Sequence, residues 1–275
     1  MPKKTIEKKG KVGDVSKSRM KKEQKKQSNA GVKIAIFFIS MVVIGLSIGI
    51  LFSPAFNLTK VIVEDGINVT SAEILNVINV TYGENILKQN YKEIKKSVAS
   101  LPYIGDVTLS VHLPDKIKIT YKERKPYAII KFLETFFIVD MHGYLLESKK
   151  EIEDSKMTVI YGMNIEEYEL GQQLDEVSGL KYKNIVQLLE TVKQKNIPYT
   201  ISEIDYESVS DVKLWIEESD IEIIYGEIKK ESLIDKLSYL SQVLNSLIEE
   251  GKKGRVDISS EAYYKETIFT DINNI

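Results

Sequence analysis

The chain has 275 residues, with 38 Lys or Arg against 40 Asp or Glu, 43% hydrophobic residues and no cysteine. This composition is typical of a folded protein. The lack of cysteine excludes thiol catalysis, thiolate zinc sites and iron–sulfur clusters. Residues 1–33 carry twelve Lys or Arg against three Asp or Glu, whereas the remaining residues carry 26 against 37. The acidic remainder gives no reason to expect a nucleic-acid partner.

An uncharged run of nineteen residues, Ile34 to Phe52, follows the basic segment. As a helix it would span about 28 Å, close to the ~30 Å hydrocarbon core of a bilayer. Basic flanks stay in the cytoplasm. We therefore predict a disordered basic cytoplasmic tail over 1–31, a single transmembrane helix over 32–53, and an extracytoplasmic remainder.

A cleaved signal peptide is the alternative, because Ser53-Pro54-Ala55 resembles a cleavage site. Secretory apolar regions are about 7–15 residues long, which favours an uncleaved anchor here. Within this predicted helix, Gly45 and Gly49 form a GxxxG pair. Such a pair lets a second helix approach closely, so we predict a helix-packing contact at these two residues.

Alternating and helical patterns succeed one another directly after the anchor. A capping box at Thr70 to Glu73 predicts one helix, and a second is expected to begin at Asn90. Alternating β-branched residues predict strands before and after these helices, the last two joined at Pro114-Asp115. The expected order is β-α-α-β-β. Three strands with two helices form a small α+β module with one core.

The rest of the chain predicts a second, larger domain. Apolar stripes predict helices over about 178–195 and 229–250. Short apolar or alternating runs predict strands near 129–130, 136–139, 144–146, 157–162, 199–206, 212–217, 222–225 and 255–259. We expect a mainly antiparallel, curved sheet covered on one side by the two helices, with core packing rather than a coiled coil for the leucine-rich last helix.

Several stretches resemble, in sequence and in order, the FtsQ family of bacterial cell-division proteins, called DivIB in Gram-positive bacteria. They are Phe56 to Gly66, Leu101-Pro102-Tyr103-Ile104, Leu113-Pro114-Asp115, Tyr121 to Ala128 and Phe137 to Leu146. The resemblance implies an FtsQ-type POTRA domain over 56–124 and an extracytoplasmic β domain over 125–275. It also implies a place at the division septum.

The chemistry-bearing residues do not form a recognisable catalytic motif. His112 and His142 have no partner at zinc-ligand spacing, and there is no Gly-x-Ser-x-Gly, Ser-x-x-Lys or phosphate-binding loop. We therefore predict no catalytic, cofactor-binding or metal-binding residue, no cofactor and no small-molecule substrate. Carboxylates such as Glu203, Asp205, Glu207 and Asp211 leave open a membrane-anchored cell-wall hydrolase or other envelope enzyme.

Two features indicate partner contacts. Trp215 shares the polar side of its predicted strand with Lys213 and Glu217, as an interface anchor would, although a ring packed under a helix is the alternative. The family resemblance implies that the last strands offer an edge for β-pairing with an FtsB/DivIC-like partner. The residues in that place are Arg255, Val256, Asp257, Ile258, Tyr263 and Tyr264.

The sequence thus predicts a non-enzymatic scaffold of the cell-division complex. Through the resemblance, its partners are FtsL-like and FtsB/DivIC-like single-pass proteins, and through them the septal peptidoglycan synthase and transpeptidase. A POTRA-bearing secretion component is the other alternative. It would need a series of barrel strands of about ten residues each, and none follows the module.

Overall fold

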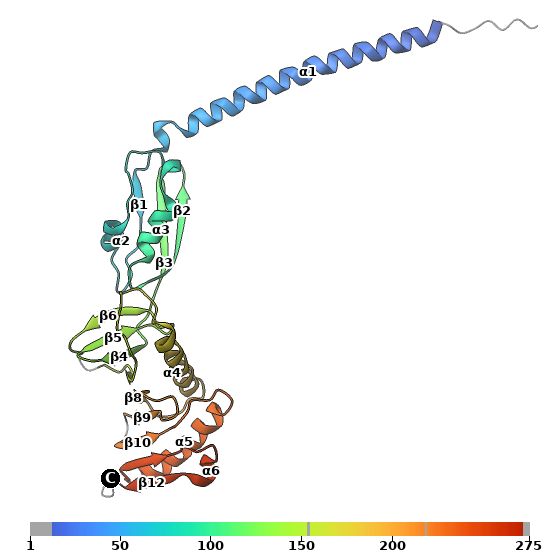
Figure 1. Cartoon of the computed structure of the whole chain (residues 1–275). Coiled ribbons are helices and arrows are strands. Elements are labelled where there is room, and N and C mark those ends of the chain that lie inside the picture. The colour runs from blue at the N-terminus through green and yellow to red at the C-terminus, as the bar shows by residue number, and fades with distance from the viewer. Residues whose placement is uncertain (1–12, 153–154, 218, 272–275) are drawn as a thin grey trace, which may run out of the picture. The chain divides into compact units, whose positions relative to one another are not determined.

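The computed structural model describes residues 13–152, 155–217 and 219–271 (Figure 1). Helix α1 (Gly13–Leu51) contains a 21-residue segment, Gly31–Leu51, that is long and apolar enough to cross a membrane, with a mean hydropathy of 2.8. Helix α1 continues backwards from this segment to Gly13, into the predicted basic tail, whose disorder stays a prediction. Lys, Glu, Gln and Met favour helix and extend the span backwards. Residues 1–12 of the predicted tail lie outside the described residues.

The described chain forms two compact units. The first contains α1, the 3₁₀ turn η1 (Pro54–Phe56), residues up to Lys60, and the segments 81–89 and 112–116. The 3₁₀ turn η2 (Ile86–Lys88) belongs to this unit. The second unit contains the other described residues. These units do not follow the predicted boundary at residue 124, so the domain limits stay a prediction.

The first sheet has three strands in the order β1-β3-β2. Its elements are β1 (Lys60–Ile62), α2 (Ser71–Val77), α3 (Tyr91–Ala99), β2 (Ile104–His112) and β3 (Lys116–Glu123). The capping box of α2 is present as predicted: Thr70 accepts from the Glu73 backbone N–H, and the Glu73 carboxylate accepts from the Thr70 N–H. At α3 the Asn90 side-chain oxygen accepts from the Glu93 backbone N–H, without the reciprocal bond to the Asn90 backbone. The β-α-α-β-β order is confirmed.

The second sheet has nine strands in the order β12-β11-β10-β9-β8-β7-β4-β5-β6. Five neighbouring pairs are antiparallel and three are parallel. The strands are β4 (Ala128–Phe132), β5 (Thr135–Val139), β6 (Leu145–Lys149), β7 (Val159–Tyr161), β8 (Ile201–Asp205), β9 (Lys213–Ile216), β10 (Ile221–Ile224), β11 (Gly254–Asp257) and β12 (Ile268–Asp271).

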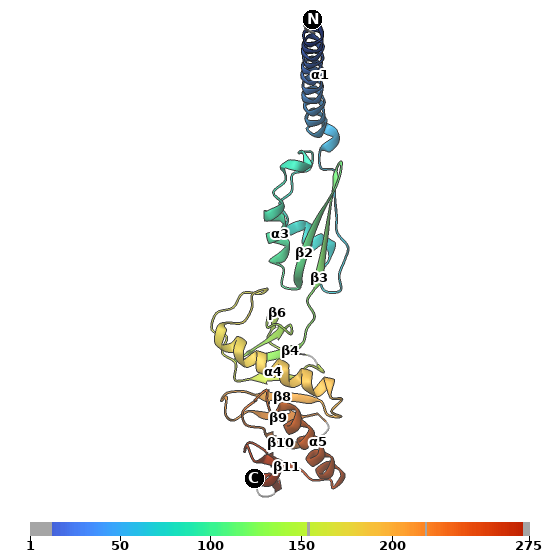
Figure 2. The same cartoon turned by 90° about the vertical axis from the view of Figure 1, so that its right-hand side faces the viewer.

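Two long helices, α4 (Glu176–Gln194) and α5 (Leu233–Glu249), cover one face of this sheet (Figure 2). The core lies between them and the sheet. Leu214, Ile223 and Val256 from neighbouring strands and Leu237 and Leu240 from α5 are all nearly or fully buried in it. The short helix α6 (Tyr263–Glu266) precedes β12. The α+β class, the mainly antiparallel sheet and its two covering helices are confirmed.

The expected edge position of residues 255–258 needs correction. Strand β11 pairs with β10 on one side and with β12 on the other, so its backbone is occupied. Val256 and Ile258 are 0% and 1% exposed, and their side chains belong to the core. Among the described strands this sheet has two edges, β6 and β12, and β12 lies next to β11; no strand was predicted there from the sequence.

Candidate partner-binding surfaces

The face of the sheet opposite α4 and α5 carries a continuous row of polar and aromatic side chains, called here the open face. Cross-strand register aligns Glu203 with Trp215, Trp215 with Glu222, Glu222 with Arg255, and Arg255 with Thr270. The five residues come from five adjacent strands, β8 to β12. The residues that flank them in β9, β10 and β11 are buried and Phe269 of β12 is partly buried, whereas these five are exposed or partly exposed. The row ends at the edge strand.

The open face brings together two residues predicted from the sequence, Trp215 and Arg255. Glu222 lies between them and pairs with the Arg255 guanidinium. Both charged side chains remain in contact with solvent: Arg255 is 38% exposed and Glu222 is 19% exposed. A partly exposed indole beside a charged pair offers one apolar anchor and directional polar contacts, the combination typical of an interface centre. Asp257, also predicted, accepts from the Ser259 N–H and hydroxyl instead.

The predicted tyrosines lie on α6, immediately before the edge strand. Tyr263 packs against Tyr239 of α5 with ring centroids 5.3 Å apart, and the Tyr239 hydroxyl donates to Thr267 Oγ1 at 3.0 Å. Tyr264 is 60% exposed. Tyr263 therefore fixes α6 to the helix layer, and Tyr264 is the tyrosine that is free to contact a partner.

A buried lysine lies beside Tyr263. Lys236 of α5 is 5% exposed and its Nζ donates to the Tyr225 carbonyl at 2.6 Å. Burial, and after it the nearby charge of Lys229, lower the pKa of Lys236 to about 8. An open hollow of about 400 Å³, lined by Lys236, Tyr263 and Glu261 among others, adjoins it. This hollow opens next to α6.

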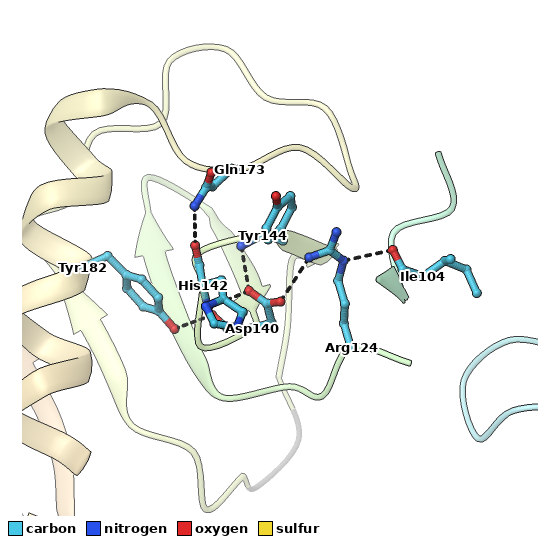
Figure 3. Close-up of polar contacts among 7 residues, drawn as sticks. All are labelled: Ile104, Arg124, Asp140, His142, Tyr144, Gln173 and Tyr182. Atoms are coloured by element: carbon cyan, nitrogen blue, oxygen red, sulfur yellow. Dashed lines mark hydrogen bonds and ion pairs between the residues drawn. The ribbon is translucent and has the colours of Figure 1, made fainter. Parts of the chain in front are cut away.

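A second polar cluster joins the end of β3 to the turn after β5 (Figure 3). Arg124 Nη1 lies 3.3 Å from Asp140 Oδ2, and its Nε donates to the Ile104 carbonyl at 3.1 Å. The guanidinium carbon lies 3.4 Å from the centroid of the Tyr144 ring. Asp140 Oδ1 also accepts from the backbone N–H groups of His142 and Tyr144, each at 2.9 Å. No role for Arg124 or Asp140 was predicted from the sequence.

The carboxylates named for the catalytic alternative lie in β8 and in the loop that follows it. No group of three or more His, Cys, Asp or Glu side chains in that part of the chain could hold a metal ion. Glu203 belongs to the open face and Asp205 accepts from the Glu207 N–H. His112 lies exposed at the end of β2.

In α1, Gly45 and Gly49 have nothing within 4 Å of an added Cβ, so the predicted helix-packing face is open.

Two family models match the chain in succession. The model described as the POTRA domain, FtsQ-type, matches residues 56–124. The model described as cell division protein FtsQ/DivIB, C-terminal, matches residues 128–259. This chain belongs to the FtsQ/DivIB family. Its predicted resemblance is thereby confirmed, and the chain is a membrane-anchored protein of cell division.

Curated relatives agree with the family. Cell division protein DivIB of Clostridium tetani (strain Massachusetts / E88) is 28% identical over 80% of this chain and 83% of its own length. DivIB of Clostridium botulinum (strain Hall) is 25% identical over 86% and 91%. A solved structure of the major extracytoplasmic domain of DivIB from Geobacillus stearothermophilus is similar at 21% identity, covering 46% of this chain and 97% of that one, with a TM-score of 0.27.

Proposed function

We propose that this FtsQ/DivIB-family member is a non-enzymatic scaffold that holds other single-pass division proteins in one complex. Its partners are FtsL-like and FtsB/DivIC-like proteins, and through them the septal peptidoglycan synthase and transpeptidase. Its amino terminus is cytoplasmic, its two sheets are extracytoplasmic, and it acts at the septum. Through these contacts it assembles or regulates septal peptidoglycan synthesis.

The observation that carries this proposal is the open face ending at β12. A sheet edge supplies unpaired backbone groups to which an extended partner segment can add as a further strand. The row beside that edge then supplies specificity through alternate side chains. Ile268 and Thr270 of β12 lie on the same side as Arg255 and Asp257, because they are their cross-strand partners. A partner strand would thus meet β12 first and Arg255 next.

The membrane anchor strengthens such contacts without any increase in buried interface area. Confinement of two proteins to one membrane raises their effective concentration, so weak interfaces between single-pass proteins become sufficient. Gly45 and Gly49 offer a helix-packing contact within the same membrane. The scaffold would therefore engage a partner both in the membrane and at β12.

Site-specific photocrosslinking tests the proposal in the full-length chain in native membranes. A photoreactive residue replaces Ile268, which is 60% exposed on β12, and in a matched variant it replaces Val177, 68% exposed on α4. We expect DivIC-like and FtsL-like proteins to crosslink to position 268 and not to position 177. Equal yields at both positions, or none at 268 in dividing cells, would overturn the edge as the docking site.

Side-chain specificity is tested by Trp215→Ala and by charge reversal, Arg255→Glu, in the same chain. We expect both variants to lose co-purifying partner while keeping the thermal unfolding midpoint of the parent within the range of Val177→Ala. Unchanged partner recovery from both would remove the open face from the interface. Muropeptide release by the purified chain would favour the envelope-enzyme alternative instead.

A further inference from the structure

The end of the anchor helix is bonded to a loop far along the chain, within the first compact unit. Asn85, only 7% exposed, donates from Nδ2 to the Leu51 carbonyl at 2.9 Å. Its Oδ1 accepts from the Leu87 N–H at 2.9 Å, which caps η2. The Gln89 side chain exchanges two hydrogen bonds with the Thr81 backbone and closes the loop 81–89. This loop is therefore built onto the helix terminus.

The hairpin tip 112–116 belongs to the same unit. Leu58, next to the anchor, donates its N–H to the Glu84 carbonyl at 2.8 Å, and Thr59 donates its N–H to the Asp115 carbonyl at 2.9 Å. Backbone hydrogen bonds thus connect both segments to Leu58 and Thr59, which lie seven and eight residues after the end of α1.

Large apolar side chains are exposed on each of these segments. Phe52 is 58% exposed, Tyr82 54%, Leu87 47% and Leu113 56%. Single exposed apolar residues are ordinary on a protein surface. Here four of them lie on one small unit that is directly continuous with a membrane span. Their combined apolar surface is unfavourable in water.

We propose that Tyr82, Leu87 and Leu113, with Phe52, seat this unit in the outer headgroup layer of the membrane that α1 crosses. These four side chains bind membrane lipid, not a protein partner. This surface is called here the membrane collar. It keeps the first unit in contact with the bilayer surface instead of separated from it by a linker.

The depth follows from the anchor. A helix of 21 residues, Gly31–Leu51, is about 32 Å long, so Leu51 lies at the boundary of a hydrocarbon core about 30 Å thick. The Asn85 amide is within 2.9 Å of the Leu51 carbonyl, which places the loop in the headgroup layer. Tyr82 and Leu87 are three and two residues from Asn85, a reach of at most about 10 Å along the chain.

The chemistry of the collar suits that layer. Tyrosine is enriched at membrane–water boundaries, where its ring is apolar and its hydroxyl stays hydrated. Lys88 and Lys116 are exposed beside Leu87 and Leu113, and lysine stems can lie along apolar surface while the ammonium reaches phosphate. Leucines that insert next to such lysines bind an interface through apolar burial and headgroup attraction together.

Spin-label accessibility tests the collar, since the chain has no cysteine and each introduced one is unique. Tyr82→Cys, Leu87→Cys and Leu113→Cys carry a nitroxide in the full-length chain, reconstituted in vesicles of equal parts phosphatidylglycerol and phosphatidylethanolamine. Val209→Cys and Leu180→Cys, 51% and 62% exposed in the other unit, are matched controls. Accessibility to oxygen, which concentrates in lipid, is measured against accessibility to a water-soluble nickel chelate.

We expect the oxygen-to-nickel ratio to be several-fold higher at positions 82, 87 and 113 than at 209 and 180. Equal ratios would overturn the collar. Shielding of the collar labels from both reagents would mean that protein covers them, and would overturn the lipid proposal as well. Thermal unfolding of each labelled chain is compared with the parent, so that a low ratio cannot come from misfolding. Loss of partner binding at β12 would not alter these ratios, which keeps this test separate from the scaffold proposal.

Discussion

Arg124 and Asp140 form an ion pair that is almost withdrawn from water, with side chains 15% and 5% exposed. Arg124 ends the first sheet by donating its backbone N–H to the Tyr103 carbonyl at 2.7 Å. Asp140 holds the turn that starts β6, because Gly143 donates its N–H to the Asp140 carbonyl at 3.0 Å. The pair therefore couples the exit from one sheet to a turn of the next within the second unit.

Removing the cation alone should be costly. We expect Arg124→Ala to lower the free energy of unfolding of the second unit by about 3 kcal/mol, because a buried carboxylate is left without its charge partner. Arg124→Lys should recover only part of this loss, since an ammonium cannot contact Asp140, the Ile104 carbonyl and the Tyr144 ring at once. Denaturant unfolding of the detergent-solubilised chain measures both variants.

Removing the anion should act differently from removing the cation. In Asp140→Ala the N–H groups of His142 and Tyr144 lose their acceptor, whereas in Arg124→Ala they keep it. Hydrogen exchange should therefore accelerate at these two amides in Asp140→Ala and stay close to the parent rate in Arg124→Ala. Equal exchange in both variants would show that the turn does not depend on the carboxylate.

Two glycines with positive φ offer a matched pair. At Gly162, with φ +79°, an added Cβ would lie 2.2 Å from the Glu207 backbone nitrogen; at Gly251, with φ +66°, it would meet nothing within 4 Å. Gly251→Ala should cost about 1 kcal/mol from backbone conformation alone. Gly162→Ala should cost well over that, because the β7 and β8 ends must separate. Thermal unfolding midpoints of the two variants distinguish them, and similar midpoints would contradict the clash.

Lys236 predicts a pH dependence of stability. Its pKa is about 8 in the folded chain against an ordinary value of 10.5, so the unfolded chain binds more protons between these values. The free energy of unfolding should therefore rise as pH increases from about 8 toward 10.5, by up to about 3 kcal/mol.

Lys236→Met supplies the control for that pH dependence, since it removes the titrating group while preserving most of the buried stem. The difference in unfolding free energy between parent and variant, measured across this range, cancels the titration of the tyrosines. A constant difference would mean that folding does not lower the pKa of Lys236.

The capping box of α2 should contribute measurably to the first sheet's module. Thr70→Ala removes the hydroxyl that accepts the Glu73 N–H and should lower stability by about 1 kcal/mol. Asn76→Ala, on the exposed side of the same helix, should be neutral or slightly stabilising because alanine has the higher helix propensity. Equal losses would indicate that the cap contributes nothing.

Local signals in the sequence were sufficient for most elements. The Thr70 to Glu73 capping box, the alternation along β2 and β3 and the apolar stripes of α4 and α5 each encode their own element. Strand β12 was missed, although Ile268-Phe269-Thr270 is a β-favouring run. Four residues next to a tyrosine-bearing turn carry too little periodicity to be distinguished from loop.

The surfaces were harder to predict than the elements because they depend on register. Trp215 and Arg255 are forty residues apart and become neighbours on one face only through Glu222 on the strand between them. Strands β4 and β5 lie between Arg124 and Asp140 in the sequence, so the contact of these two residues depends on the tertiary structure. Val256 and Ile258 are buried in the core, and β12 occupies the other edge of β11, a pairing that the alternation of β11 does not reveal.

Strand β7 gives the nine-stranded sheet a mechanical weak point. It has three residues and is aligned with β4 at two of them and with β8 at three. Among the described strands, it alone joins β4-β5-β6 to the strands from β8 to β12. A load applied at the β12 edge and resisted at Arg124 has to cross this narrow ladder or the helix layer above it. If septal growth pulls on a bound partner, tension would part the sheet at Ile160 before it stripped the longer pairs on either side.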